Sequence, residues 1–444
     1  MGSLEVYVIT FNCARELVSP DVFAQHFFNG LGGPKAPNIL IVSLQEIAPI
    51  AYSFLGGSYL EPYFERIRAT VNTAARSFDG ASYINIITRN LGMTAIMAFV
   101  LQDQTQNIDW IETAGVGVGL HGMGNKGAVG LTFGHVAQEQ ETRLCFVAAH
   151  LAPMEDAVER RNEDWKNLVR GLVFTPLRGT ADRTSTRKHG REEVDEDSAP
   201  LLPGSPDNST APTTGIYAPT SHLVLAGDLN YRTSKTKPSP IDYRVFPKPT
   251  QDTTDSRHYS NLLKEDQLSS EMKAQRTCHG LCEVPIDFPP TYKYSDKARA
   301  VAKVNGDNQW QWARHRWPSW CDRILYLGLP SRLKAQDRRL QIQTHRYTAL
   351  PLMSTSDHRP VALSLSIPLR AIPLPDSEVD ADDVRLNPPF SIDPLWRQKR
   401  AMARRKELVV GAGAFLSLTW EGRIVLLATI VGIVGGWWVI ASLL

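Results

Sequence analysis

The stretch PSWCDRIL, at residues 318–325, places an acid and a guanidinium at the start of an apolar segment. The apolar residues indicate a buried strand, where an unpaired carboxylate would be costly to desolvate. Asp322 therefore needs a partner. One candidate is a structural ion pair with Arg323, and the other is His358 in the sequence SDHRPV. An aspartate that holds a histidine in one tautomer prepares a proton-handling group.

Apolar runs that alternate or carry β-branched residues recur on both sides of this segment, and they predict strands. They lie at residues 5–11, 38–46, 82–88, 94–101, 114–120, 126–133, 143–150, 222–229, 323–328 and 360–367. Apolar residues at helical spacing predict two long helices at about 60–78 and 154–173. The alternation predicts one α/β domain over residues 1–368, interrupted at 178–219 by a polar insertion that we expect to be disordered.

Polar side chains stand at the ends of several predicted strands. Those at or just beyond a strand end are Asn12, Glu46, His150, Asp228 and Asn230, while Asn125 and Lys126 stand beside the start of another strand. Any one of them is explained by a turn or a cap. The repetition of carboxylates, amides and a histidine instead predicts that the strand ends line one shared site.

The residue types at these strand ends suit one reaction. The side-chain oxygens of Glu46 and Asn12 are ligands that Mg²⁺ accepts. Asp228 and Asn230 lie two apart and face the same side of an extended segment, so that one can accept a proton while the other orients a water or phosphate oxygen. The two histidines can bind or protonate an anionic oxygen. The set predicts metal-assisted hydrolysis of a phosphate ester by water.

Cationic residues gather shortly before the PSWCDRIL stretch. Lys293 lies in the sequence TYKY, and Arg314 and Arg316 follow. These side chains could form an ordinary solvated basic face. Because they are interleaved with Tyr292 and lie close to the acid in sequence, they favour a grip on a second phosphate.

Composition limits the class of protein. With 444 residues, of which 43% are hydrophobic and 21% charged, the chain has room for one large globular domain and an appendage. The net charge of +2 gives no sign of a nucleic-acid partner. Five scattered cysteines favour reduced thiols in a cytosolic setting.

The C-terminal segment has a different composition. Residues 424–444 read IVLLATIVGIVGGWWVIASLL, carry no charge and, at about 1.5 Å per residue, are long enough to cross a hydrocarbon core of about 30 Å. Residues 369–423 are first rich in Pro and Asp and then basic, so we expect a linker with a basic juxtamembrane end. Basic flanks stay in the cytosol. We therefore predict a transmembrane tail anchor with the upstream domain in the cytosol.

With these residues assembled, the chain resembles the inositol polyphosphate 5-phosphatases of the endonuclease/exonuclease/phosphatase superfamily. The resemblance runs in order over about residues 1–367. It rests on TFNCA (10–14), LQEI (44–47), GNKGAV (124–129), HLAP with RRNEDW (150–165), GDLNYR (227–232), DQL (266–268), PPTYKY (289–294), PSWCDRIL (318–325) and SDHRPV (356–361). The hydrophobic tail is similar to that of the fungal endoplasmic-reticulum phosphoinositide 5-phosphatase.

The resemblance implies a DNase I-like sandwich, in which two packed mixed β-sheets are flanked by helices and the site lies at the sheet edges. It implies that Asp228 activates the attacking water and that Asn230 and His150 contact the scissile phosphate. Asp322 would pair with His358, which acts on the same phosphate. At position 148 the chain has Ala where the family often has Asn.

The resemblance also assigns the remaining site residues. Glu46 and Asn12 would hold Mg²⁺, and Asp357 would support the metal and the water. The residues expected at the substrate are Tyr292, Lys293, Arg314, Arg316, Asn125 and Lys126. Four of these, Tyr292, Lys293, Arg314 and Arg316, would hold the neighbouring 4-phosphate.

Resemblance and tail together imply a Mg²⁺-dependent enzyme that removes the 5-phosphate of phosphatidylinositol 4,5-bisphosphate at the cytosolic face of a membrane. The endoplasmic reticulum is the expected membrane, with the mitochondrial outer membrane as the alternative. Two other functions remain open, a nuclease or sphingomyelinase of the same superfamily and a non-catalytic phosphoinositide-binding tether. The TYKY segment and the near-neutral charge disfavour the nuclease. The intact set of acids and histidines disfavours the tether.

Overall fold

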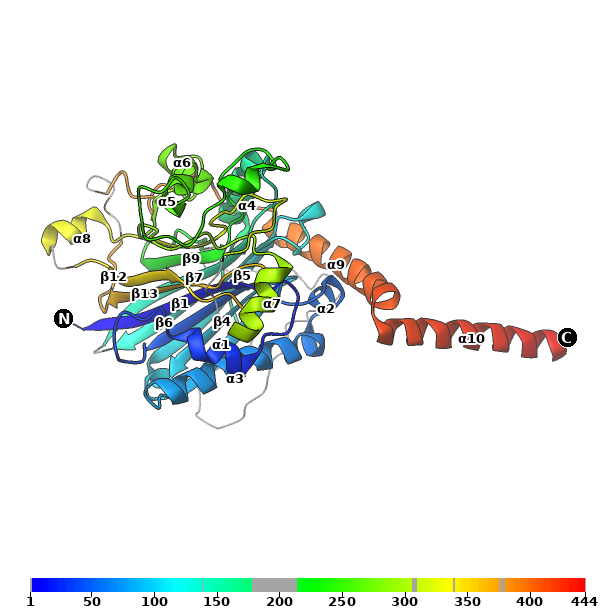
Figure 1. Ribbon diagram of the computed structural model, residues 1–444. Coiled ribbons are helices and arrows are strands. Elements are labelled where there is room, and N and C mark those ends of the chain that lie inside the picture. The colour runs from blue at the N-terminus through cyan, green and yellow to red at the C-terminus, as the bar shows by residue number, and fades with distance from the viewer. Residues whose placement is uncertain are drawn as a thin grey trace.

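Two mixed β-sheets pack face to face in the computed structural model, which describes residues 2–137, 139–177, 214–305, 310–337, 340–374, 376 and 380–443 (Figure 1). The first sheet has the strand order β12 (Gln343–Ala349), β13 (Val361–Pro368), β1 (Ser3–Asn12), β2 (Ile39–Gln45), β4 (Thr94–Leu101), β3 (Tyr83–Leu91). The second has the order β10 (Leu281–Cys282), β11 (Asp322–Leu327), β9 (Ser221–Asp228), β7 (Gln140–His150), β6 (Gly127–Ala137), β5 (Ile108–Gly117), β8 (Thr175–Pro176). The pairs β1–β2 and β7–β9 are parallel, and the other pairs are antiparallel.

The core between the sheets consists of alternate, inward-facing residues of both. Val6 and Ile41 of the first sheet share one buried cluster with Phe146, Val224 and Ile324 of the second. Side chains two apart on a strand point to the same face, so the alternation seen in the sequence places one set of residues between the sheets and the other set beneath the helices. The predicted DNase I-like sandwich is confirmed.

Helices cover the outer faces of the sandwich. The described helices are α1 (Pro20–Phe27), α2 (Ile50–Leu55), α3 (Glu61–Phe78), α4 (Val158–Gly171), α5 (Tyr259–Leu263), α6 (Gln267–Lys273), α7 (Asp296–Asn305), α8 (Ser331–Gln336), α9 (Trp396–Leu418) and α10 (Trp420–Leu443). Phe23 of α1 and Ile67 of α3 pack on the first sheet, whereas Trp165 of α4 packs on the second. Both predicted long helices are present, as α3 and α4.

All ten predicted strands are present, within a few residues of their expected ends. The sequence reading missed β12, whose residues QTHRYTA show little apolar alternation because this edge strand leaves most side chains partly or fully exposed. Its backbone pairing with β13 defines it instead. Most of the insertion predicted at 178–219 lies outside the described residues.

The structure differs from the expected linker after the domain. Residues of the predicted basic juxtamembrane end form α9, a helix of 23 residues that packs against α2. Its buried residues are Ala403, Glu407 and Gly411, one on each successive turn. This interface is small and polar rather than an apolar stripe, so hydrophobic periodicity does not reveal it.

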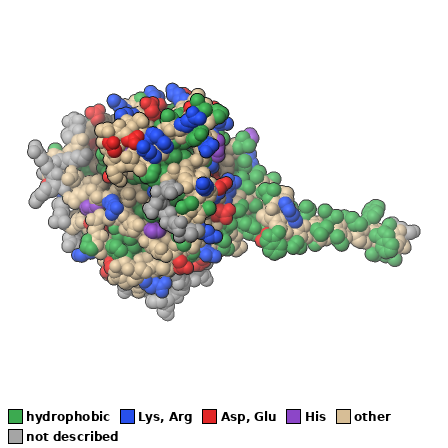
Figure 2. Space-filling view, viewed as in Figure 1, with side chains coloured by type: hydrophobic (Ala, Val, Ile, Leu, Met, Phe, Trp, Pro, Cys, Tyr) green, Lys and Arg blue, Asp and Glu red, His purple; other side chains and the backbone are tan. Residues whose placement is uncertain are grey.

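The helix α10 projects away from the globular body (Figure 1). Among the described residues, it is the one helix long and apolar enough to cross a membrane, and its apolar stretch is not buried against the protein. Figure 2 shows hydrophobic side chains over most of its visible surface. It begins at Trp420, a few residues before the apolar segment predicted at 424–444.

Candidate active site

The candidate site lies where strand ends from both sheets meet. In the second sheet, Asp228 at the end of β9 is in register with His150 at the end of β7 and with Asp322 at the start of β11. Asn12, which ends β1 in the first sheet, donates from Nδ2 to Oδ2 of Asp228 over 2.9 Å. These polar strand ends therefore do come together, and the hydrogen bond joins the two sheets.

Asp228 is buried and held by several hydrogen bonds. Its Oδ2 lies 3.2 Å from Nε2 of His150, and its Oδ1 accepts from the backbone N–H of Asn230 over 3.1 Å. Burial alone would raise the pKa of Asp228, but the hydrogen bond with His150 and the charge of His358 outweigh burial and hold the pKa below its usual range. The carboxylate is consequently ionised at neutral pH and fixed in one orientation.

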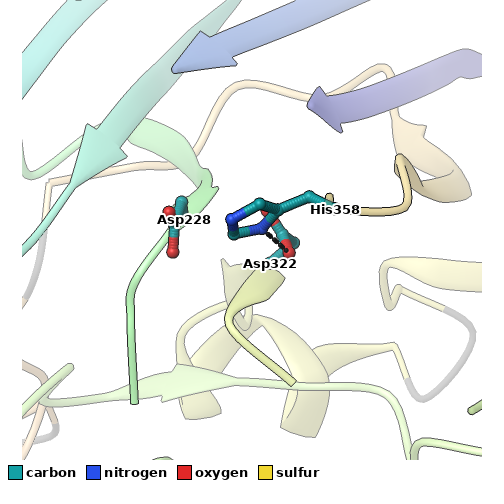
Figure 3. Close-up of side chains that lie close together, drawn as sticks. All are labelled: Asp228, Asp322 and His358. Atoms are coloured by element: carbon teal, nitrogen blue, oxygen red, sulfur yellow. Dashed lines mark hydrogen bonds and ion pairs between the residues drawn. The ribbon is translucent and has the colours of Figure 1, made fainter. Parts of the chain in front are cut away.

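Asp322 and His358 form the predicted pair. Nδ1 of His358 lies 2.9 Å from Oδ2 of Asp322, and the same oxygen accepts from the hydroxyl of Thr291 over 2.7 Å. Figure 3 shows the imidazole ring between the carboxylates of Asp322 and Asp228. Burial would lower the pKa of His358, but the negative charges of the two aspartates raise it to about 9. His358 is therefore an imidazolium at neutral pH.

The other histidine beside Asp228 is neutral. Burial, and then the charge of Lys126, lower the pKa of His150, whose Nε2 is hydrogen-bonded to Nζ of that lysine. The same Nζ lies 3.7 Å from Oε1 of Glu46, and Nε of Arg15 lies 3.0 Å from Oε2. Burial would raise the pKa of Glu46, but the surrounding positive charges lower the pKa by more than burial raises it. This carboxylate is therefore also ionised.

Left-handed backbone turns redirect the chain just beyond three of these strand ends. The residues concerned are Glu46 after β2 (φ 45°), Asn230 after β9 (φ 58°), and Ala14 and Arg15 after β1 (φ 52° and 69°). Residues other than glycine adopt this region rarely, because Cβ crowds the backbone. Tertiary contacts must hold these turns, and such strained positions are common at functional sites.

The strand ends open into a cleft of about 260 Å³. Its walls carry both signs of charge. The predicted site residues that line it are Asn12, Glu46, Lys126, Asp228, Asn230, Tyr292, Lys293, Asp357 and His358, and it is also lined by Arg15, Arg232, Asp296 and Arg299. Nζ of Lys293 pairs with Oδ2 of Asp357 over 2.5 Å. A cleft that offers both carboxylates and cations suits an anionic substrate and a hard metal ion together.

Several predicted site residues do not line this cleft. His150 and Asp322 lie beneath its floor, where they orient Asp228 and His358. Arg316 pairs with Glu155 over 2.8 Å.

Two of the expected substrate residues lie outside the cleft as well. Arg314 is exposed, with its guanidinium 4.2 Å from the ring centre of Tyr243. Asn125 stands next to Lys126, but its side chain does not line the cleft. The structure thus brings the residues predicted to be catalytic together and leaves part of the expected phosphate grip outside the cleft.

Arg232 is the most informative residue that the sequence reading missed. It is buried, its guanidinium lies 4.4 Å from the ring centre of Tyr292, and it donates to both oxygens of Asn230. Its Nη1 has no hydrogen-bond partner among the described residues. The sequence could have indicated Arg232 as a site residue, because it lies two residues after Asn230 in the segment GDLNYR. No sequence signal points to Arg15 or to Arg299 of α7.

The donor set of the cleft fits Mg²⁺. Glu46 is ionised, and about a fifth of its side chain remains exposed. Oδ1 of Asn12 accepts one hydrogen bond, from the backbone of Ala14 over 3.0 Å, which leaves a second lone pair. The ligand-bearing atoms of Asp228, Asp322 and His358 also lie within 4.8 Å of one another. In this group Nδ1 of His358 is engaged by Asp322, so the three side chains form an ion-paired cluster.

Ala148 lies two residues before His150 in β7. Its side chain is buried between the sheets, in the core cluster. The orientation of His150 comes instead from Asp228 and Lys126.

The helix α9 contacts the loop that carries Lys126 and the end of α2. Glu407 accepts from the backbone of Gly124, two residues before Lys126. Arg404 donates to the carbonyl oxygens of Phe54 and Leu55, at the end of the helix that follows Glu46. A helix assigned to the linker by sequence is therefore packed beside the site.

Comparison with known proteins identifies the class. The model of the Endonuclease/Exonuclease/phosphatase family 2 matches residues 9–364, so the chain belongs to this family. Among solved structures it is similar to the inositol polyphosphate 5-phosphatase domain of SPSynaptojanin, in complex with inositol (1,4)-bisphosphate and calcium ion. That match has a TM-score of 0.56 and 22% identity, and covers 91% of this chain and 93% of the other, which supports the fold.

Its curated relatives narrow the class. The type II inositol polyphosphate 5-phosphatase 15 of Arabidopsis thaliana is 28% identical over 66% of this chain. The type II inositol 1,4,5-trisphosphate 5-phosphatase of Mus musculus is 26% identical over 76%, and a polyphosphatidylinositol phosphatase of Saccharomyces cerevisiae is 27% identical over 74%. The match spans about a quarter of the length of each relative. The family predicted from the motifs is confirmed.

Proposed function

We propose that this protein is a Mg²⁺-dependent phosphoinositide 5-phosphatase that converts phosphatidylinositol 4,5-bisphosphate to phosphatidylinositol 4-phosphate. The observation that carries the proposal is the position of Asp228 between a neutral His150 and a charged His358, on the floor of a cleft lined with cations. Pure binding of a phosphate has no use for a buried, ionised acid placed between two histidines.

The residues supply the steps of ester hydrolysis. Asp228 orients a water and takes up its proton as the water oxygen attacks phosphorus. The negative charge of a phosphate beside this carboxylate raises its pKa and makes it a better base. His358 donates a hydrogen bond to the phosphoryl group, the bond between phosphorus and the inositol oxygen breaks, and that oxygen takes a proton from solvent water to form the free hydroxyl. Asp228 then returns its proton to solvent. Asp322 keeps the imidazole charged and fixes its orientation.

Asn12 and Glu46 would hold Mg²⁺, which neutralises charge on the phosphoryl oxygens when it is bound. Asp357 would support the metal and the water. Asn230 and His150 would contact the scissile phosphate. Each of these groups lies in or directly beneath the same cleft.

The part of the cleft around Tyr292 would bind a second phosphate. Lys293 and Arg232 flank the ring of Tyr292, at 5.4 Å and 4.4 Å from its centre. Two cations about one aromatic side chain suit the phosphate that neighbours the scissile group. Arg316 lies close enough to Lys293 for its charge to act on the pKa of that lysine. We therefore place Arg316 at the rim of this subsite.

The membrane assignment rests on α10 and its basic flank. We propose that α10 anchors the protein in the endoplasmic-reticulum membrane with the catalytic domain in the cytosol, the mitochondrial outer membrane being the alternative. An anchored enzyme meets a lipid substrate at a high effective concentration, which favours a lipid over a soluble inositol phosphate.

Phosphate release by the full-length chain in detergent micelles tests the proposal. The substrates are phosphatidylinositol 4,5-bisphosphate, inositol 1,4,5-trisphosphate and a DNA oligonucleotide, and Asp228→Asn is the inactive control. We expect release from the lipid, about a thousandfold or more slower in the variant. Equal activity of the variant, or cleavage of DNA alone, would overturn the assignment.

A further inference from the structure

A second cavity, of about 310 Å³, lies between α9 and the second sheet. It is bounded by the end of β5 with the turn that follows, by α4 and by the first half of α9. It shares no lining residue with the active-site cleft. Nothing in the proposed reaction uses it.

The walls of this cavity are strongly cationic. The basic residues that line it are His121, Arg160, Arg170, Lys399, Arg400 and Lys406, whereas Asp393 is its sole carboxylate. That carboxylate is already hydrogen-bonded by Lys399, which lowers its pKa. Asp164, outside the lining, pairs with Arg160. The positive charge of this cavity therefore exceeds the negative charge nearby.

Two further cations, Arg170 and Lys406, line the cavity, and the charge of Arg170 acts on nearby Asp393. Among the described residues, neither Arg170 nor Lys406 forms an ion pair, and they approach the cavity from different helices, α4 and α9. Like charges that converge on one space repel each other and weaken the packing of α9 unless an anion lies between them. An anion bound here would contact both helices at once.

The lining of the cavity combines a guanidinium close to the backbone of β5 with apolar side chains. The guanidinium of Arg400 lies against the backbone of β5 at Gly115, where a Cβ atom would come within 2.7 Å of its Nη1. Val116, Met402 and the ring of Trp396 supply an apolar wall beside the cations. A space with an apolar wall and a cationic rim suits an organic phosphate better than a bare inorganic ion.

We propose that this cavity is a second binding site, for an organic phosphate, separate from the catalytic cleft. The ligand would bridge α4 and α9 and hold α9 against the domain. Because α9 leads directly into α10, the phosphate could belong to a lipid headgroup or to a free molecule. The chemistry that recognises it is the same in both cases.

Hydrogen exchange of the full-length chain separates the two sources, and the cavity variants described below distinguish this cavity from the catalytic cleft. Soluble inositol 1,4-bisphosphate is added to protein in nanodiscs of phosphatidylcholine. In the other arm, the nanodiscs contain phosphatidylinositol 4-phosphate. We expect slower exchange over residues 115–122 and 396–406 in at least one arm, and the arm that responds identifies the source.

Charge-matched variants decide whether the effect is specific. In the double variant Arg170→Gln with Lys406→Gln, the ligand concentration required for half-maximal protection should rise about tenfold or more. Arg66→Gln with Arg405→Gln removes the same charge from exposed positions outside the cavity and should change it less than about twofold. Met402→Glu keeps every cation but adds a carboxylate to the wall, and it should also weaken binding.

The outcomes are distinct from those for the catalytic cleft. Protection of both segments that is lost in the cavity variants and kept in the control supports the site, whatever the activity of the protein. Absence of protection in both arms would overturn it. Equal loss in the cavity pair and the control pair would overturn it too, because the attraction would then be non-specific.

Discussion

Glu407 accepts a hydrogen bond of 2.7 Å from the backbone N–H of Gly124, across 283 positions of the sequence. The carboxylate is buried, with the residue 3% exposed. Gly124 opens the loop whose Lys126 contacts both Glu46 and His150. The helix that leads into the candidate membrane span thus supports a loop of the active site.

Glu407→Ala should lower kcat more than it changes KM. The loss of a buried partner leaves the N–H of Gly124 unsatisfied, at a cost of about 1–3 kcal/mol, and loosens the position of Lys126. Glu407→Gln keeps an acceptor oxygen and should retain most of the activity. Steady-state kinetics with thermal unfolding of each variant measure this. A fall in Tm without a fall in kcat would mean that the contact is only structural.

Truncation tests whether α9 belongs to the catalytic unit. A chain that ends at Leu418 should hydrolyse a soluble inositol phosphate as fast as the full-length protein, because the contacts of α9 remain. A chain that ends at Pro368 should lose most of this activity, since Glu407 no longer holds the Gly124 loop and Arg404 no longer holds the end of α2. Full activity of the shorter chain would show that α9 is dispensable.

The pair Asp322–His358 predicts a specific pH dependence. A raised pKa means that the imidazolium is present below about pH 9 and is lost as pH rises through that value. Asp322→Asn removes the negative charge, so the alkaline limb of kcat should move to lower pH by about one unit or more. The pair should also make the free energy of unfolding larger in the wild type than in this variant. That difference should be greatest below the pKa of an unfolded histidine, and it should disappear as pH rises through about 9. An unmoved alkaline limb would mean that it belongs to another group.

Substitution of Arg232 should weaken substrate binding, whereas substitution of Arg314 should have little effect on it. Arg232→Gln should raise KM about tenfold for a bisphosphorylated headgroup, because Arg232 lines the cleft and its buried Nη1 has no hydrogen-bond partner among the described residues. Arg314→Gln should change KM less than about twofold, since its guanidinium lies on Tyr243. An equal rise in KM for both variants would show that Arg314 moves into the cleft when substrate binds.

Metal removal should abolish activity and lower stability. Mg²⁺ at about 100 times its Kd stabilises a protein by about 2.7 kcal/mol, so chelation should lower Tm measurably. Glu46→Gln should show little Tm response to Mg²⁺, whereas Glu61→Gln, on the surface helix α3, should respond as the wild type does. If the Tm of Glu46→Gln still rises with Mg²⁺, other oxygens hold the ion.

The sequence predicted the strands of the sandwich and most of the cleft for a definite reason. Inward-facing apolar residues repeat every second position, and the acids and amides that interrupt this pattern, such as Asp228 and Asn230, stand where strands end. It could not indicate β12, whose side chains are largely exposed. It also misjudged α9, because that helix packs through Ala403 and Gly411 and through polar bonds to backbone groups.

The residues along the chain fix the chemistry available: an aspartate and a histidine for the pair, oxygen ligands at strand ends, and an apolar C-terminal segment. Local patterns carry this information because burial and backbone period act on neighbouring residues. The tertiary structure alone decided which side chains meet. It brought Arg232 into the cleft, left Arg314 on Tyr243, and joined Glu407 to Gly124, because such contacts depend on the packing of segments that are remote in the chain.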